Sequence, residues 1–334
     1  MVTETTNKLV LQGTTAYYEN LVPDVANRLK SDELVFLHDI LPGNCQYNCL
    51  KCFSESSDVY SGQLKERGLS SKHMDKNRLF HEAYENGVRS IIVPGAGEPL
   101  ISPELNNVIK ICSDLGLRLI VFTNGLLLDR KKAEEYFSKG VSVVLSLDSI
   151  SAENYDKLTR SCGNFNRVLK NLESALDLSD KYAAIHNGYK AVPLAVNTNP
   201  TILTFNSSKN EIDDIHQLVL GRAAHFVSHL TPNGNARLFW KQLVGNDGFS
   251  QNPVLKEAEK RYAVGLGGSS RRKDGKCAYI YNGVVQFDGY WMACPNMGLI
   301  ADFGRYPEVS IEQHFSIKKR FLNEKNNPSC LTRD

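Results

Sequence analysis

The sequence predicts an α/β fold: a partial (β/α)6 barrel of parallel strands, followed by a small C-terminal module that contains a hairpin. Two observations lead to this prediction. Short apolar segments alternate with amphipathic helical segments from about residue 33 to about residue 230, which is the pattern of a parallel sheet. Six such units occur, fewer than a closed barrel needs. We therefore expect a partial, open barrel.

Each expected strand is short, rich in β-branched and other apolar residues, and has turn-forming residues nearby. In chain order the strands are Leu34–Ile40, Val88–Val93, Arg118–Phe122, Val141–Leu147, Val192–Asn197 and His225–Leu230. The helices between them are Asp75–Asn86, Pro103–Leu115, Lys131–Lys139, Phe165–Leu178 and Glu211–Val219. The helix at Pro103 has Ser102 as its N-cap candidate and Gly116 after its end. Loops that follow the carboxyl ends of parallel strands build the active sites of such folds, so functional residues are expected there.

The character of the sequence changes after about residue 235. A basic, glycine-rich stretch from Gly265 to Lys276 leads into a hairpin-like segment from Cys277 to Cys294, with a turn at Asp288-Gly289. We therefore divide the chain into a leader or cap at 1–32, the barrel at 33–235 and a C-terminal module at 236–334.

Composition narrows the class of protein. A chain of 334 residues is long enough to bury a core without disulfides. The net charge of +2 gives no reason to expect a nucleic-acid partner. The polar N-terminus shows no secretory signal and no apolar run is long enough to span a membrane, so a cytoplasmic protein is expected. In a reducing compartment, clustered cysteines favour metal binding or catalysis over disulfides.

Three of the eight cysteines lie in the loop after the first strand, where Cys45, Cys49 and Cys52 form a C-x3-C-x2-C pattern. A structural zinc site usually has four ligands in paired spacings, and no second pair or histidine lies nearby. Three thiolates can instead hold a 4Fe–4S cluster that keeps one iron open for another ligand. A zinc site and a chance cluster remain the alternatives.

The C-x3-C-x2-C loop resembles the defining motif of the radical SAM (S-adenosylmethionine) superfamily. The resemblance implies that the open iron chelates S-adenosylmethionine, whose reductive cleavage yields a 5′-deoxyadenosyl radical. It also implies a flavodoxin- or ferredoxin-type electron donor. The family often places an aromatic residue before the third cysteine. Lys51 stands there in this chain, and Phe53 or the Lys51 side-chain stem is expected to contact the adenine instead.

Further motifs follow the later strands in the order that the family shows. Ala96-Gly97-Glu98-Pro99 is similar to the family's GGEP motif, whose main chain or Glu accepts hydrogen bonds from the ligand ammonium. Thr123-Asn124-Gly125 follows the third strand, and the stretch around Ser146 and Asp148 is similar to the family's SLD segment. The resemblance implies that the cofactor-binding residues are Phe53, Ala96, Gly97, Glu98, Pro99, Thr123, Asn124, Ser146, Asp148 and Asn197.

A second cysteine set, Cys277 and Cys294 around Gly289, resembles the start of the SPASM and twitch extensions of this superfamily. These extensions carry an auxiliary Fe–S cluster, and a hairpin can bring two cysteines at its ends together. Cys330 is the expected third ligand. The fourth ligand is another side chain, a substrate, Cys162 or Cys112, or one iron keeps an open position. The alternative is that these cysteines are buried structural residues.

Two residues near the expected barrel mouth are candidates for catalysis. Cys162 lies in the loop after the fourth strand and could donate a hydrogen atom to a substrate radical. His229 ends the sixth strand and could face the substrate as a base. A loop cysteine without a role in catalysis is the alternative for Cys162. Cys112 lies in a helix beside isoleucines and is expected in the core.

The resemblance implies an enzyme that oxidises or epimerises a carbinol carbon of a small polar metabolite of the sugar or aminocyclitol type. An alternative is a maturase that crosslinks or epimerises a ribosomally made peptide. A third possibility, of a different class, is a non-enzymatic metal-binding protein. No membrane or nucleic-acid partner is expected.

Overall fold

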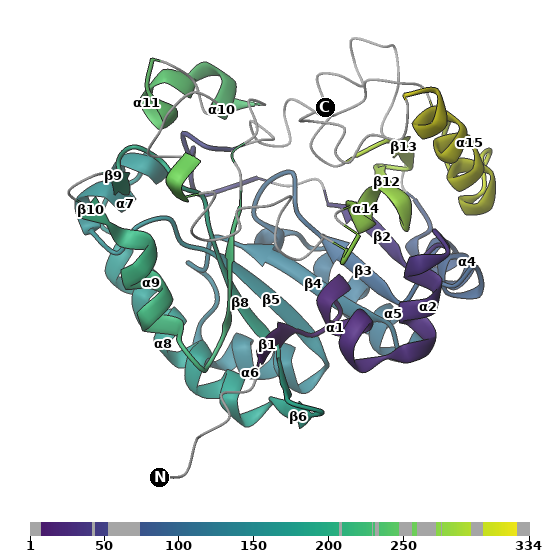
Figure 1. Ribbon diagram of the computed structural model, residues 1–334, viewed down its shortest axis with the longest axis horizontal. Helices are drawn as coiled ribbons and strands as arrows, with labels where there is room; N and C mark the ends of the chain where they lie inside the picture. Colours follow the sequence, from purple (N-terminus) through teal and green to yellow (C-terminus); the bar gives the residue numbers. More distant parts are fainter. Residues whose placement is uncertain are drawn as a thin grey trace.

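An eight-stranded, mostly parallel sheet forms the centre of the protein, with strand order β11-β8-β5-β4-β3-β2-β12-β13 (Figure 1). The computed structural model describes residues 8–41, 44–52, 74–206, 209–228, 230, 234–246, 256–258, 272–274, 276–294 and 303–325. The strands predicted from the sequence are all present and pair in parallel. They are β2 (Phe36–Ile40), β3 (Ser90–Val93), β4 (Arg118–Thr123), β5 (Val141–Ser146), β8 (Leu194–Thr198) and β11 (Ala224–Val227). The predicted α/β partial barrel is thus confirmed.

The helices between these strands pack their apolar faces on the outer side of the sheet, where the larger core cluster lies. They are α4 (Lys76–Glu85), α5 (Leu105–Leu115), α6 (Arg130–Ser138), α7 (Ala152–Thr159), α8 (Phe165–Lys181) and α9 (Glu211–Val219). Helix α5 ends as predicted at Gly116, whose φ of +68° suits glycine. The predicted start at Pro103 is wrong. The segment Pro99–Ile101 first forms a 3-10 turn capped by Glu98, so α5 begins only at Leu105.

The N-terminal segment, whose role the sequence did not reveal, closes the amino end of the barrel. Strand β1 (Lys8–Leu11) pairs with β7 (Tyr189–Val192), which also pairs with β6 (Ala184–His186). Helices α1 (Thr15–Leu21) and α2 (Pro23–Lys30) follow. Apolar residues of this segment pack against interior-facing strand residues. The Oγ atoms of Ser90 and Ser142 donate to the carbonyls of Gly13 and Gln12 at 2.7 and 3.0 Å.

Short elements surround the carboxyl end of the barrel. Strands β9 (Phe205–Asn206) and β10 (Lys209–Asn210) form a small antiparallel pair before α9. Helices α10 (Asn235–Leu238) and α11 (Trp240–Val244) pack a small apolar cluster onto Leu50 of the cysteine loop.

The C-terminal hairpin extends the barrel sheet. Strand β12 (Gly283–Phe287) pairs in parallel with β2, and β13 (Tyr290–Met292) pairs antiparallel with β12. The predicted turn is present, with left-handed φ values of +49° at Asp288 and +83° at Gly289. Helix α14 (Ala278–Tyr281) precedes the hairpin and α15 (Ile311–Glu324) follows it. In the part of the chain that the structure describes, no helix combines the length and apolar character of a membrane span.

Candidate functional site

The loop that carries Cys45, Cys49 and Cys52 leaves the carboxyl end of β2 and is tied to the loop after β3. The backbone N–H of Ala96 donates to the carbonyl of Leu41 at 3.1 Å, and that of Glu98 donates to the carbonyl of Asn44 at 2.9 Å. The first half of the cysteine loop is therefore positioned by the Ala96–Pro99 motif, as the parallel arrangement of β2 and β3 requires.

The second half of the cysteine loop is held by elements from two other parts of the chain. Leu50 donates its N–H to the carbonyl of Leu158 on α7 at 2.8 Å. The Asn235 side chain of α10 donates to Asn48 Oδ1 at 2.7 Å and to the Cys49 carbonyl at 3.0 Å. The loop thus has a defined backbone path, and its thiols share one region.

The three thiols lie within electrostatic range of one another. Burial raises the pKa of Cys45, and the neighbouring Glu98 and Cys52 charges add to the effect. Burial also raises the pKa of Cys49 well above its usual value, against a lowering by the Lys51 charge. The Cys45 sulfur accepts from the Tyr47 N–H at 3.4 Å and from Asn124 Nδ2 at 3.8 Å. Cys45 and Cys49 therefore favour the protonated thiol, and cluster binding has to displace their protons.

The donor set suits an iron–sulfur cluster in its chemistry, because one loop at the strand ends carries three thiols. The described residues hold no group of three or more His, Cys, Asp or Glu side chains arranged to bind a metal ion. The assignment of a cluster to these thiols therefore depends on their spacing and their shared loop, and not on a preformed coordination shell.

Glu98 is 2% exposed, and protein donors occupy its carboxylate. Its Oε1 accepts from Thr123 Oγ1 at 2.7 Å and from the Leu100 N–H at 3.0 Å, and its Oε2 accepts from the Asn124 N–H at 2.8 Å. Burial raises the pKa of Glu98, and these donors oppose the rise. Glu98 therefore joins the loop after β3 to the loop after β4.

Asn124, in the predicted turn after β4, reaches the cysteine loop. Its Nδ2 atom lies 3.1 Å from Gln46 Oε1 and 3.8 Å from the Cys45 sulfur, and its Oδ1 accepts from the Leu126 N–H at 3.0 Å. The structure thus brings Thr123 and Asn124 together with Glu98 and Cys45, four residues that the sequence had singled out separately.

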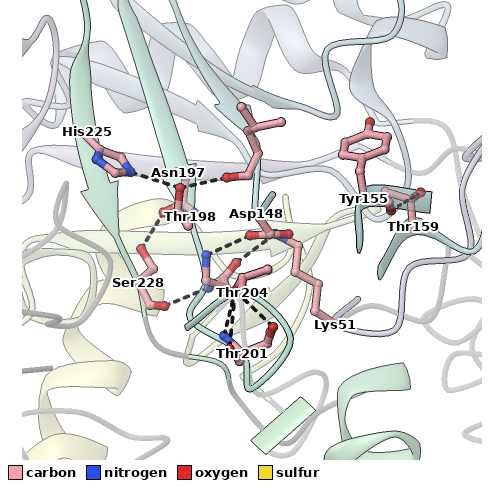
Figure 2. Close-up of polar contacts among 12 residues, drawn as sticks. Lys51, Asp148, Tyr155, Thr159, Asn197, Thr198, Thr201, Thr204, His225 and Ser228 are labelled. Atoms are coloured by element: carbon pink, nitrogen blue, oxygen red, sulfur yellow. Dashed lines mark hydrogen bonds and ion pairs between the residues drawn. The ribbon is translucent and has the colours of Figure 1, made fainter. Parts of the chain in front are cut away.

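Lys51 stands where the family often has an aromatic residue. It forms an ion pair with Asp148, which follows β5 (Figure 2). Its Nζ lies 2.5 Å from Asp148 Oδ2 and donates to Asn199 Oδ1 at 2.9 Å. The Asn199 N–H donates to Asp148 Oδ1 at 2.8 Å. Lys51 and Asp148 side chains are only 14% and 8% exposed, so the pair anchors the end of the cysteine loop to β5 and β8.

Asn197 and Ser146 are neighbours across β8 and β5, and both are half-buried. Ser228 Oγ donates to Asn197 Oδ1 at 2.5 Å, and the Ser228 carbonyl accepts from Asn199 Nδ2 at 2.9 Å (Figure 2). The predicted Asn197 therefore belongs to a hydrogen-bonded set that connects β8 with the residue after β11.

The hairpin cysteines, Cys277 and Cys294, are buried at 8% exposure each. Both lie within electrostatic range of the ammonium of Lys318 on α15. Burial lowers the pKa of Lys318 to about 8, and the two cysteine charges counteract the decrease. Both predicted ligands are therefore buried and within electrostatic range of one lysine. The sequence did not indicate a role for this lysine.

Two further predicted cysteines lie among the described residues. Cys162 is exposed after α7, and Cys112 is buried in the core of α5 as predicted. Phe53, His229 and Cys330 lie outside the described residues.

Sequence reasoning also missed Glu211, which is 2% exposed at the start of α9. Its carboxylate accepts from the Ile150 N–H at 2.9 Å and from Asn154 Nδ2 at 2.7 Å, so it fixes the loop after β5. A single glutamate at a helix start carries no motif. The sequence predicted only that Glu211 begins a helix, and this does not indicate which loop its carboxylate contacts.

Residues 40–189 match the Radical SAM superfamily. Curated relatives include an AdoMet-dependent heme synthase from Methanosarcina barkeri, 28% identical over 198 residues, which are 58% of this chain and 50% of that protein. A probable GTP 3',8-cyclase from Methanococcus maripaludis is 30% identical over 163 residues, 48% of this chain and 51% of that protein. The chain thus spans about half the length of these relatives.

Two solved structures share the fold. The crystal structure of Streptococcus suis SuiB bound to the precursor peptide SuiA has a TM-score of 0.55 at 15% identity, covering 87% of this chain and 67% of that one. The structure of anSMEcpe with bound AdoMet and Cp18Cys peptide has a TM-score of 0.57 at 14% identity, covering 89% and 84%. At these identities the likeness establishes the fold alone.

Proposed function

Because residues 40–189 make this chain a member of the radical SAM superfamily, we propose that Cys45, Cys49 and Cys52 hold its 4Fe–4S cluster. Members of this superfamily use such a cluster together with S-adenosylmethionine. When bound, the two supply a 5′-deoxyadenosyl radical that removes a hydrogen atom from the substrate. The observation that carries the proposal is that the three thiols share one loop, which is hydrogen-bonded to the next strand loop and to α7.

The residues around this loop would hold the cofactor in defined ways. Asn124 donates to the Cys45 sulfur, and a hydrogen bond to a ligating sulfur tunes a cluster. Lys51 fixes the third cysteine by its ion pair with Asp148. Glu98 joins two loops by its hydrogen bonds, so the main chain of Gly97 beside it would bind S-adenosylmethionine.

The proposed substrate is a small polar metabolite of the sugar or aminocyclitol type. Half-buried Ser146 and Asn197 supply a hydroxyl and an amide near the strand ends. Phe122 and Phe226 are partly buried on the apolar cluster that fills the barrel interior. Phe226 is the cross-strand partner of Asn197, and polar groups beside an aromatic ring suit the binding of a hydroxylated ring.

The net reaction proposed is oxidation of a carbinol carbon. Loss of a hydrogen atom leaves a carbon radical, which becomes a carbonyl by losing one electron and its hydroxyl proton. A second cluster on Cys277, Cys294 and Cys330, in a twitch-like module at 236–334, would accept that electron. The exposed position of Cys162 favours oxidation over epimerisation, because a thiol donor has to reach the substrate. A flavodoxin- or ferredoxin-type protein would deliver the reducing electron to the first cluster.

The test of the core proposal is anaerobic reconstitution of the chain with iron and sulfide, followed by reductant and S-adenosylmethionine. We expect 5′-deoxyadenosine from the wild type and none from the Cys45→Ala/Cys49→Ala/Cys52→Ala variant. The variant should keep iron bound at the second cysteine set. Absence of 5′-deoxyadenosine from iron-loaded wild type would refute the proposal.

The substrate proposal is tested by the product of turnover. Polyol and aminocyclitol candidates should gain a carbonyl without incorporating deuterium from heavy water. A product with the same molecular formula as the substrate, apart from one deuterium taken from heavy water, would instead indicate epimerisation. Modification of a precursor peptide would indicate a maturase. Either result would overturn the proposed oxidation of a small metabolite.

A further inference from the structure

One segment of the chain, residues 148–159, contacts the cysteine loop between its second and third thiols. The segment comprises the loop after β5 and helix α7. At its start, Asp148 forms the ion pair with Lys51 (Figure 2). At its other end, the Leu158 carbonyl accepts from the Leu50 N–H at 2.8 Å. Both ends of the 148–159 segment therefore hold the stretch that leads to the third cysteine.

The same segment also holds the stretch between the first and second cysteines. The Tyr155 hydroxyl donates to the Tyr47 hydroxyl at 3.1 Å, and the two residues are 3% and 7% exposed. The Asn48 N–H donates to the Thr159 carbonyl at 3.3 Å. Because contacts to both stretches come from one segment, a shift of the 148–159 segment would displace the cysteine loop on both sides of its second thiol.

A buried carboxylate on α9, that of Glu211, holds the 148–159 segment in place. Its Oε2 accepts from the Ile150 and Ser151 N–H groups at 2.9 and 3.3 Å and also from the Ser149 hydroxyl. Its Oε1 accepts from Asn154 Nδ2 at 2.7 Å. The N-cap side chain of α7 makes no capping hydrogen bond, so Glu211 supplies an acceptor at the start of α7 from another helix. Four donors from the start of this segment thus converge on one carboxylate.

We propose that Glu211 is a positioning residue for the cysteine loop, and that it acts through the 148–159 segment. Its hold on the loop needs no cluster, whereas its effect on iron binding rests on the proposed function. A loop that is already held in its binding conformation loses less conformational entropy when it takes up a ligand. Removal of the Glu211 acceptor should therefore loosen the cysteine loop and weaken iron binding at its three thiols.

The first experiment measures hydrogen exchange of single backbone amides in the iron-free, full-length chain. Glu211→Ala should speed exchange of the Asn48 and Leu50 amides about tenfold or more, since loss of one hydrogen bond to a carboxylate is worth about this factor in local opening. The Val143 amide, which donates to the Pro193 carbonyl at 2.8 Å within the sheet, should stay as protected as in wild type. Glu211→Gln should keep the slow exchange, because its amide oxygen can accept from residues 149–151.

The matched control is Val219→Ala, which removes fully buried apolar volume from the same helix and leaves the carboxylate in place. Val219→Ala should leave the Asn48 and Leu50 amides slow. Unchanged exchange in Glu211→Ala, or equal acceleration in both variants, would overturn the positioning role. If Glu211→Ala does not fold, Ser149→Ala/Asn154→Ala removes the two side-chain donors instead. This variant should also speed exchange of the two loop amides, and slow exchange in it would count equally against the proposal.

The second experiment measures iron content after anaerobic reconstitution. Glu211→Ala should bind less iron than wild type, and Glu211→Gln should bind as much as wild type. Wild type that binds no iron would refute the proposed function, and the exchange experiment would still decide the role of Glu211. Faster loop exchange in Glu211→Ala together with unchanged iron content would overturn the effect of Glu211 on iron binding.

Discussion

Replacement of Asp148 by Asn tests whether the Lys51 ion pair holds the cysteine loop in place. The change removes the carboxylate that lies 2.5 Å from Lys51 Nζ while keeping the shape of the side chain. Breaking a buried ion pair costs about 3–5 kcal/mol. Lys51 is 14% exposed and keeps the Asn199 Oδ1 acceptor at 2.9 Å, so the expected loss is smaller. We expect the free energy of unfolding to fall by about 2–3 kcal/mol.

The assay combines urea unfolding of the iron-free chain with iron content after anaerobic reconstitution. Because Lys51 directly precedes Cys52, Asp148→Asn should also bind less iron than wild type at the first cluster. The matched control is Asp114→Asn, whose ion pair with Lys110 has side-chain exposures of 73% and 61% and should contribute less than about 0.5 kcal/mol. If Asp148→Asn matches Asp114→Asn in both unfolding midpoint and iron content, the ion pair does not hold the loop.

Three further predictions concern other parts of the fold. Burial lowers the pKa of His38 to about 3 from an ordinary value of 6.5, so the unfolded chain binds more protons between these values. His38 should therefore contribute a fall in stability of up to about 1.4 kcal/mol for each pH unit below 6.5, and His225 and His314, whose pKa values are also lowered by burial, should add to it; His38→Phe should reduce the slope in urea unfolding by the His38 share, whereas exposed His81→Gln should leave it unchanged. Gly283→Ala would place a Cβ 2.7 Å from the Tyr279 carbonyl oxygen and should cost about 1–3 kcal/mol, read from the urea midpoint; an unchanged midpoint would show that the β12 start can shift. Cys162→Ser should leave both iron content and 5′-deoxyadenosine formation unaltered, because Cys162 is exposed, and a loss of either would place it at the site.

The barrel was predictable because each strand is short, apolar and followed by a turn. Such strands can be recognised from the spacing of apolar residues alone. The N-terminal cap was not predictable for a physical reason. Its packing depends on partners far along the chain, such as Ser90 and Ser142, which donate to the carbonyls of Gly13 and Gln12. Local sequence contains no information on such contacts. The hairpin turn was predictable, yet its pairing with β2 was not, because register across a distant strand is set by tertiary packing.

The site was predictable as far as motif residues lie at strand ends, and Cys45, Glu98 and Asn124 do meet there. Their partners escaped prediction. Lys51 could be seen as a departure from an aromatic residue, but its pairing with Asp148 joins positions on two loops and has no spacing signal. In the sequence Lys318 looks like any lysine in a helix. Nothing in the residues around it indicates that this face of the helix is buried against α14 and β12.

The two acidic residues singled out as cofactor contacts show what a strand-end motif can encode. Protein donors occupy the Glu98 carboxylate through Thr123, Leu100 and Asn124, and Asp148 is bonded to Lys51 and Asn199. Hydrogen bonds within the protein reduce the cost of burying such a carboxylate, and the Lys51 charge reduces it further for Asp148. Both residues therefore act first by fixing one loop against the next. It follows that their substitution should disturb the thiol arrangement, and hence iron content, before it alters any contact with a bound cofactor.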